Sequence, residues 1–558
     1  MEDRATGTVA GHEVKCVLPI TVRIGVTGHR SLGDEEEIKK SVRKVLARIS
    51  EILGGTPHSF VAVSPLAEGA DRLVAKEILA TQQNSLDARG LTVPLPMPVE
   101  VYVQDFASGE SKAEFRELLA LANRSLELEA DAKKFEREPN DSAETENLKK
   151  DNRRQAFRRV GLWVVDECDV VIAIWNGDKA KGVGGTAEIV EYARRIHRSL
   201  AWIDSQTGEI KDEKYDQRLL KAFEHHIAFN AENLSAKQIA SESERRFAKL
   251  TEQAEKTGLD RNVIEELRQT LLPDFVRATM LAARYQKFYL NAGTWVYILA
   301  ATSVATVTVA AVLQTNRLIK DAGERLIWLE VVQIGIIMLL LALSGFRGWH
   351  RKWIDYRFLA ERLRAAMFLF VAGIACDPPL ALGHQGVSDE WMVGAFKSIC
   401  SACPKPGNLP KLIAPVKDFL LLGWISGQQK FYSAKSKEHE FRYRWLEISG
   451  YFVFGLTAVA AIWHAYPHTP DFLRNPLASV AIILPATGAS LAGIRTYREH
   501  LRNAKRYESM DRYLTGVIAR IQMETNPAWL GSILHEANEV MMREHEDWRV
   551  VMLPDIKP

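Results

Sequence analysis

The stretch Thr21-Val-Arg-Ile-Gly-Val-Thr-Gly-His-Arg30 decides the fold of the N-terminal part of this chain. Residues 21–27 are apolar enough for a buried strand, and Gly28-His29-Arg30 follows as a tight turn. The acidic run Asp34-Glu-Glu-Glu37 then begins a helix that extends to about Leu53. Acidic residues favour the first turn of a helix because they complement its dipole. The stretch therefore predicts a strand, a glycine turn and a helix, which is the repeating unit of an α/β fold.

The same alternation continues through residues 20–207. Further apolar strands are predicted at residues 59–64, 99–106, 169–175 and 199–204. Strands that alternate with helices predict a parallel, doubly wound sheet. In such sheets ligands bind beyond the carboxyl ends of the strands, and three loops rich in glycine and charged residues fall there.

These three loops supply the candidate ligand-binding residues. Glycines let a backbone approach a phosphate closely, and helix N-termini direct free N–H groups at it. An arginine fork suits phosphate oxygens, and carboxylates can accept hydrogen bonds from ribose hydroxyls or a base edge. Each residue alone has an ordinary interpretation as a turn glycine or a surface charge, but three such loops together favour a site. The candidates are Gly28, His29 and Arg30; Ser64, Glu68, Gly69 and Asp71; and Asn176, Gly184, Gly185, Thr186 and Glu188.

Other classes of site are disfavoured. The chain has no GxGxxG or Walker-type loop, which argues against dinucleotide oxidoreductases and NTPases. A formal net charge of +2 gives no nucleic-acid signature, so no nucleic-acid partner is expected. Cys400 and Cys403 form a CxxC with no second pair at zinc-finger spacing, so neither a metal site nor a cofactor is predicted.

Residues 108–160 are rich in charge and predict an insertion within the α/β domain that is partly disordered or helical. Its basic residues can reach an anionic ligand, but a solvated helix face is the favoured interpretation. They are Arg153, Arg154, Arg158 and Arg159.

The three loops resemble those of the SLOG superfamily. Ser64-Pro-Leu-Ala-Glu-Gly-Ala-Asp71 is similar to the second loop of the DNA-processing protein A fold, and Gly184-Gly-Thr-Ala-Glu188 is similar to the phosphate loop of LOG-type cytokinin-activating hydrolases. The resemblance covers residues 20–204 and implies a Rossmann-like nucleotide-binding domain. LOG hydrolases carry their catalytic glutamate one position after Glu188, where this chain has Ile189. The resemblance therefore implies a binder rather than an enzyme, with a nucleotide- or NAD-cleaving hydrolase as the alternative.

Four apolar stretches follow the soluble part, each about as long as a membrane-spanning helix. Short linkers join them in pairs, so they predict two hairpins in an all-α membrane domain with four transmembrane helices. Basic residues gather at the open ends of both hairpins, for example Arg347 and Arg495. By the positive-inside rule both chain termini should face the cytoplasm. We expect the membrane to be the inner (cytoplasmic) membrane. The stretches are residues 292–313, 326–346, 448–466 and 476–494.

The two hairpins look like copies of one unit. The second stretch of each ends in a similar tripeptide, Gly345-Phe-Arg347 or Gly493-Ile-Arg495, and a basic, aromatic helix follows. The segment Trp353-Ile-Asp-Tyr-Arg-Phe-Leu-Ala-Glu-Arg-Leu-Arg364, with a weaker echo at residues 507–513, resembles the SLATT family of two-span effectors. That family is associated with nucleotide-signal and SLOG sensors in prokaryotic conflict systems. The resemblance implies a homo-oligomeric, pore-forming or membrane-disrupting antiviral effector in the lipid bilayer, which answers an NAD-related or cyclic-nucleotide signal.

The predicted organisation follows from these segments. A sensor joined to an effector is the favoured function, because phosphate-type loops are fused to two hairpins; a membrane-tethered hydrolase and a structural scaffold stay open. In order, the predicted parts are an N-terminal tail (1–19), the nucleotide-binding domain (20–207), a helical stalk (208–285), the first hairpin with its cytosolic helix (286–368), a cytosolic insertion (369–430), the second hairpin with its helix (431–521) and a C-terminal tail (522–558).

Overall fold

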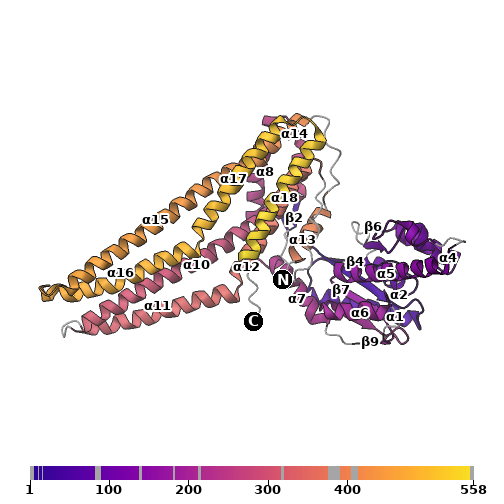
Figure 1. The fold of residues 1–558 in the computed structure, drawn as a ribbon, viewed down its shortest axis with the longest axis horizontal. Helices are drawn as coiled ribbons and strands as arrows, with labels where there is room; N and C mark the ends of the chain where they lie inside the picture. Colours follow the sequence, from indigo (N-terminus) through magenta and orange to yellow (C-terminus); the bar gives the residue numbers. More distant parts are fainter. Residues whose placement is uncertain are drawn as a thin grey trace. The chain divides into compact units, whose positions relative to one another are not determined.

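The computed structural model describes residues 6–9, 12–15, 17–81, 90–136, 141–179, 183–211, 215–315, 320–374, 390–401, 403 and 413–552. The chain forms two compact units, an α/β unit and a helical unit (Figure 1). The α/β unit consists mainly of Lys15–Asn233 and Pro378–Ala402, and the helical unit of Leu234–Asp377 and Cys403–Pro558. Within the predicted N-terminal tail, β1 (Thr6–Val9) and β2 (His12–Lys15) pair as a two-stranded sheet.

A seven-stranded sheet in the order β6-β5-β4-β3-β7-β8-β9 forms the centre of the α/β unit. Every pairing is parallel except that of β8 with β9, which confirms the α/β, doubly wound fold class. All residues of β7 are buried, as expected for a central strand covered on both faces. The strands are β3 (Ile20–Gly28), β4 (His58–Val63), β5 (Leu91–Leu95), β6 (Arg124–Glu127), β7 (Val170–Ile174), β8 (Ser199–Ile203) and β9 (Ile210–Lys211).

Helices connect and cover these strands. The first begins after Asp34, whose side chain accepts a hydrogen bond from the Glu37 N–H and so caps the helix. Its buried face is aliphatic and belongs to the same core as β3 and β4. The helices of the α/β unit are α1 (Glu35–Ile52), α2 (Ala70–Thr81), α3 (Val99–Tyr102), α4 (Gly109–Ala120), α5 (Ala143–Glu167), α6 (Thr186–Arg195), α7 (Tyr215–Asn230) and α13 (Glu390–Ser401), with short 3₁₀ turns η1 (Val103–Asp105) and η2 (Ala132–Lys134).

The strand predicted at residues 99–106 is wrong. Pro98 starts a helical turn instead, and residues 99–105 form α3 and η1. The strand in this part of the chain is β5, which precedes the predicted range and contains Pro94. A proline argues against a strand because it lacks a donor N–H. The pairing of β4 with β5 involves only Leu91 and Thr92, so β4 does not require that donor.

The described residues of the charged segment 108–160 contribute a strand and helices to the α/β fold. Within its described residues, β6 pairs in parallel with β5, and α5 packs against β3 and α6. The apolar face of α5 is narrow, which explains why its composition resembles a solvated helix; the buried residues are Arg153, Ala156, Val160, Val164 and Val165.

Two helices predicted to lie outside the α/β domain belong to the α/β unit. Helix α7, which the sequence analysis assigned to the stalk, packs against α1 and β8. Helix α13, from the predicted cytosolic insertion, packs against α7 and β3. Amphipathic patterns identify such helices, but the patterns do not say which surface covers the apolar face.

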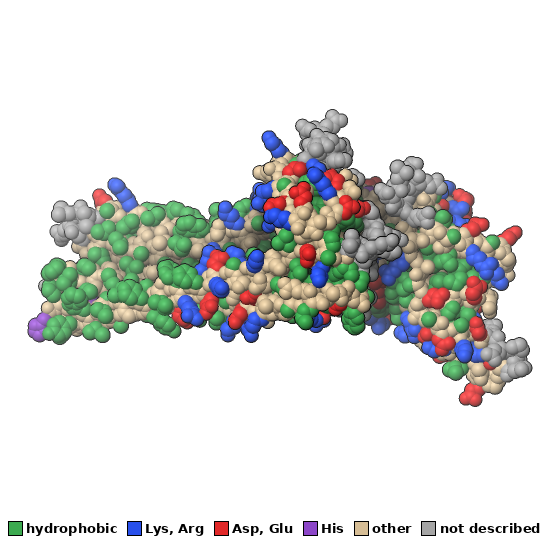
Figure 2. All heavy atoms as spheres, turned by 90° about the horizontal axis from the view of Figure 1, so that it is seen from above, with side chains coloured by type: hydrophobic (Ala, Val, Ile, Leu, Met, Phe, Trp, Pro, Cys, Tyr) green, Lys and Arg blue, Asp and Glu red, His purple; other side chains and the backbone are tan. Residues whose placement is uncertain are grey.

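Within its described residues the helical unit contains four helices long and apolar enough to cross a membrane, at Leu271–Gln314, Asp321–Phe346, Ile413–Ala465 and Phe472–Met523. Their apolar side chains are largely exposed, among them Trp328, Phe452 and Ile462. Hydrophobic side chains cover much of the surface in the space-filling view (Figure 2). Exposed apolar surface on this scale suits a lipid environment, so the chain is a multi-pass membrane protein. The helices are α8 (Ala236–Thr257), α9 (Arg261–Gln269), α10 (Leu271–Gln314), α11 (Lys320–Phe346), α12 (Trp349–Val371), α14 (Ile413–Leu420), the π-helical turn η4 (Leu421–Ile425), α15 (Ser426–Ala465), α16 (Asp471–Tyr497), α17 (His500–Met523) and α18 (Pro527–Met552).

The helical unit repeats one pattern twice, in agreement with the predicted duplication. In α10–α11–α12 and again in α15–α16–α17, the first long helix packs against both helices that follow it. The second and third helices of each set meet at a residue in left-handed conformation, Gly348 (φ 58°) or Glu499 (φ 48°). Residues 527–552 of the predicted C-terminal tail form α18, which packs against α12 and α17.

Candidate functional site

A cavity of about 450 Å³ opens at the carboxyl ends of β3 and β7. Gly28 and Ile174 are register partners at the ends of these strands, so the loops that follow both strands begin side by side. The N-termini of α2 and α6 and one face of α5 complete the walls. The volume lies within the range of small-molecule sites. The topology thus brings the three predicted loops to one edge of the sheet.

The first loop is held in one conformation by its backbone. The His29 N–H donates to the Ile174 carbonyl at 3.0 Å, and the His29 carbonyl accepts from the Ala70 N–H at 3.1 Å. A Cβ atom at Gly28 would overlap the Ala70 side chain and lie 2.8 Å from the Ile174 oxygen. Only glycine therefore fits this approach of α2 to β3. Gly28, His29 and Arg30 all line the cavity.

The third loop presents a helix N-terminus to the cavity. Gly185 is the N-cap of α6 and provides no side-chain cap, so the first N–H groups of α6 stay available for an anion. Gly184 adopts a φ of +81°, and a Cβ atom there would lie 2.9 Å from the Arg154 carbonyl. Four of the candidate residues, Asn176, Gly184, Gly185 and Thr186, line the cavity.

Glu188 braces this loop and does not line the cavity. Its carboxylate accepts from the Gly184 N–H at 2.8 Å and from Arg158 at 2.5 Å. The Gly184 hydrogen bond and the Arg158 pair hold the pKa of Glu188 below its usual value. The next residue, Ile189, lines the cavity and packs against Gly161 of α5. An aliphatic side chain therefore faces the cavity at the position where the LOG hydrolases carry their catalytic glutamate.

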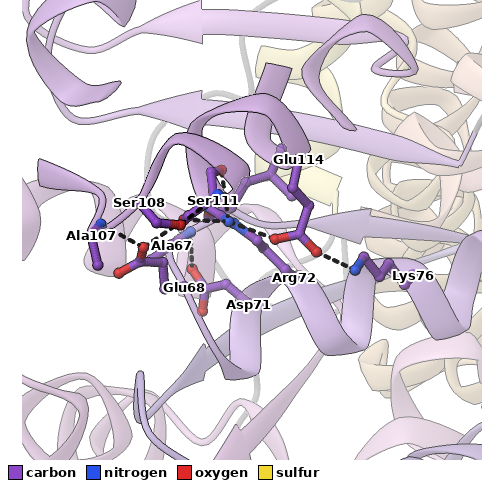
Figure 3. Close-up of polar contacts among 10 residues, drawn as sticks. Ala67, Glu68, Asp71, Arg72, Lys76, Ala107, Ser108, Ser111 and Glu114 are labelled. Carbon is purple, nitrogen blue, oxygen red and sulfur yellow. Dashed lines mark hydrogen bonds and ion pairs between the residues drawn. The ribbon is translucent and has the colours of Figure 1, made fainter. Parts of the chain in front are cut away.

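The second loop contributes only Asp71 from its predicted residues. The Glu68 carboxylate accepts from Ser111 at 2.5 Å and from the Ala107 N–H at 2.9 Å, in a network that joins α2 to α4 (Figure 3). Ser64 is buried, and its hydroxyl accepts from the Leu66 N–H. Ser64, Glu68 and Gly69 thus build the loop and are not among the residues that line the cavity.

Gly69 has a φ of +82°, and a Cβ atom there would overlap the Arg30 carbonyl. This glycine lets the first and second loops touch. It acts on the cavity through the position of Arg30 rather than by facing it.

Several lining residues come from segments that the sequence did not identify as a site. Tyr102, Phe157 and Trp175 supply aromatic surface, and Asp178 and Lys179 lie beside Asn176. Tyr102 was missed because its segment was interpreted as a strand. No local pattern marks Phe157, which lies in the charged helix α5.

The four arginines of α5 separate into different roles. Arg154 lines the cavity and is exposed. Arg153 is buried and pairs with Asp105 at 2.6 Å, whereas Arg158 pairs with Glu188. Arg159 lies 3.8 Å from Glu129. Of these four, Arg154 is the one placed to meet a ligand.

The positively charged residues that line the cavity are exposed, whereas the carboxyl group of Asp71 is buried. Arg30, Arg154 and Lys179 are exposed at the cavity, and none forms an ion pair with another described residue. Asp71 lies deeper, and burial raises the pKa of its carboxyl to about 7, although Ala67, Arg30 and Arg72 act in the opposite direction. Three exposed cations that form no ion pair with a described residue, at an opening lined by helix N-termini, suit an anionic ligand.

The raised pKa of Asp71 predicts a pH dependence of stability. The pKa of Asp71 is about 7 in the folded state and about 3.9 in the unfolded state. Between these pH values the folded protein therefore holds a proton on Asp71 that the unfolded chain has released. Stability from this group is fully present below about pH 4 and is lost as pH rises through 7. We expect the melting temperature of the wild type to fall more steeply between pH 5 and 7.5 than that of Asp71→Asn. The exposed Asp178→Asn serves as control, and parallel profiles for wild type and Asp71→Asn would contradict the assignment.

The fold and the site define a class of protein: a parallel α/β unit whose cavity is lined in part by exposed cations, joined to a helical membrane unit. Residues 424–548 match the family model described as SMODS and SLOG-associating 2TM effector domain 1. The chain therefore carries a SLATT domain, which spans α15, α16, α17 and most of α18. The match lies on the second hairpin, where the sequence showed only the weaker echo of the family. The parallel sheet is compatible with the SLOG-type fold that the loops resemble, and no curated protein matches the chain.

Proposed function

We propose that this protein senses a nucleotide-derived signal in its α/β unit and relays it to a membrane effector. The observation that carries the proposal is the position of α13. This helix lies in the chain segment between the two hairpins, after α12 and before α15, yet it packs within the α/β unit. A displacement in the α/β unit therefore acts on the chain that joins the hairpins.

The docking of α13 is specific. Trp391 is buried and packs against His226 and Phe229 of α7, with ring centroids 5.9 and 5.7 Å apart. Ser398 shares a hydrogen bond of 2.9 Å with Thr21. Thr21 lies near the start of β3, whereas Gly28 at the end of the same strand lines the cavity. A single strand of the central sheet thus connects the candidate ligand site to α13.

The membrane part supports the effector role. The SLATT match covers the second hairpin, and the first hairpin has the same helix pattern. We infer that ligand binding rearranges the hairpins within a homo-oligomer and makes the membrane permeable. We propose prokaryotic antiviral defence as the setting, with the protein in the inner membrane and its termini in the cytoplasm, because the SLATT family that the sequence resembles is associated with conflict systems.

The hydrolase alternative has less support from the site. Glu68 and Glu188 are engaged with other protein groups, and Ile189 faces the cavity. Asp71 is the one predicted carboxylate that lines it. If the full-length protein releases a free base from AMP or NAD, the hydrolase alternative is correct.

The test uses full-length protein in lipid nanodiscs and in liposomes that contain a fluorescent dye. We expect AMP, ADP-ribose or a cyclic dinucleotide to raise the melting temperature, since binding at 100 times the Kd adds about 2.7 kcal/mol. The same probe should release the dye. Arg30→Gln and Arg154→Gln should each weaken binding at least tenfold, since each removes one charged partner worth about 1.5–3 kcal/mol. Arg116→Gln on exposed α4 is the control, and absence of binding and release for all probes would contradict the proposal.

A further inference from the structure

Tyr102 has a polar group that nothing in the described protein satisfies. Its side chain is fully buried and lines the cavity, yet its hydroxyl has no hydrogen-bond partner among the described residues. The ring is held in place by Phe106, Phe115 and Phe157, with centroids 5.0, 5.7 and 6.1 Å away. A buried hydroxyl without a partner is costly and rare in native proteins, so a fixed one beside a cavity indicates a ligand.

Asp71 lies beside it with spare capacity to accept hydrogen bonds. The carboxyl is buried and lines the same cavity. Its side chain accepts a single long hydrogen bond from the Ala67 N–H, at 3.3 Å, among the described residues. A carboxylate has room for about four donors, so most of this capacity is unused. Asp71 and Tyr102 also interact electrostatically with each other.

The other residues that line the cavity include exposed cations and apolar side chains. The cations Arg30, Arg154 and Lys179 are exposed, whereas Val160 and Phe157, which packs against Tyr102, add apolar surface. A free inorganic anion would pair with the cations, but it would form no hydrogen bond with the Tyr102 hydroxyl or the Asp71 carboxyl. A purely apolar ligand would leave both sets unsatisfied. A molecule with an anionic end and a flat, uncharged end that carries O–H or N–H donors satisfies all of them.

We propose that Tyr102 and Asp71 form a polar floor in the cavity and bind the nucleoside end of a nucleoside phosphate, whose phosphate lies at the Gly28–Arg30 and Gly184–Thr186 loops. Tyr102 is then a specificity-determining residue that separates nucleotides from smaller phosphates. This inference rests on the proposed sensor function and names the chemical class of its ligand.

The experiment compares Tyr102→Phe with wild type in full-length protein. Phenylalanine keeps the ring and removes only the hydroxyl. We expect Tyr102→Phe to weaken binding of AMP, ADP-ribose or a cyclic dinucleotide about tenfold, while binding of inorganic phosphate stays unchanged. Without ligand, the melting temperature of Tyr102→Phe should equal or exceed that of wild type, because an unpaired buried hydroxyl has been removed.

Tyr192→Phe is the matched control. The Tyr192 hydroxyl donates to Asp166 at 2.7 Å and lies outside the cavity lining. Its loss should lower stability slightly without changing affinity. Unchanged nucleotide affinity in Tyr102→Phe, or a lower melting temperature without ligand, would overturn the floor assignment alone. Failure of wild type to bind any nucleotide would instead overturn the proposed sensor function.

Discussion

Gly493→Ala should separate the two membrane hairpins. Helices α10 and α16 pack through a reciprocal pair of contacts, in which each helix places a tyrosine against a glycine of the other. A Cβ atom at Gly493 would overlap the ring of Tyr297, and one at Gly293 would overlap the ring of Tyr497. Tyr497 cannot move aside easily, because its hydroxyl donates to the Tyr289 carbonyl at 2.9 Å. Overpacking of this kind costs about 1–3 kcal/mol per site.

The measurement is thermal unfolding in detergent, combined with disulfide cross-linking between cysteines introduced on α10 and α16. Gly493→Ala and Gly293→Ala should both lower the melting temperature and the cross-linking yield. Gly455→Ala on α15 is the matched control, since a Cβ atom there meets nothing within 4 Å. If Gly493→Ala behaves like Gly455→Ala, the reciprocal packing does not hold the hairpins together.

Trp391→Ala should disconnect ligand binding from the membrane. Trp391 is only 4% exposed, and truncation of a buried tryptophan typically costs about 3–5 kcal/mol. We expect α13 to leave the α/β unit, while the cavity keeps its affinity because Trp391 is not among its lining residues. The nucleotide-induced rise in melting temperature should therefore persist while nucleotide-triggered dye release is lost.

Val393→Ala controls for this substitution, since Val393 lies on the same helix and is only half-buried. It should leave both binding and release close to wild type. Loss of binding in Trp391→Ala would indicate a damaged α/β unit rather than uncoupling. Normal release with a detached α13 would show that the signal reaches the membrane by another route.

Much of the fold was predictable because its central elements carry strong local signals. The strands β3, β4, β7 and β8 lie within one or two residues of their predicted ranges. The four spans were equally clear, since long apolar helices differ in composition from everything around them. Elements with mixed signals were missed: Pro94 obscured β5, and the dense charge of α5 hid its narrow buried face.

The candidate site was predictable in its loops but not in every side chain. Glycine-rich turns after buried strands identify the edge of a sheet, and Gly28, Gly184 and Gly185 do line the cavity. Whether Glu68 faces the cavity depends on Ser111, which is 43 residues away in the chain. Glu188 likewise depends on Arg158. Local patterns do not contain the positions of such partners.

The sequence by itself determined that this protein has two chemically different halves. One half has glycine turns after buried strands, and the other has helices whose side chains are too apolar to face water. These follow from backbone sterics and hydrophobicity, which are local properties. Only the tertiary structure decided that Asp71 and Tyr102 share a cavity, and that Ser398 meets Thr21 across 377 positions of the chain. The physical reason is that side-chain direction and helix docking depend on shape-matched partners from distant segments, which become neighbours only when the core packs.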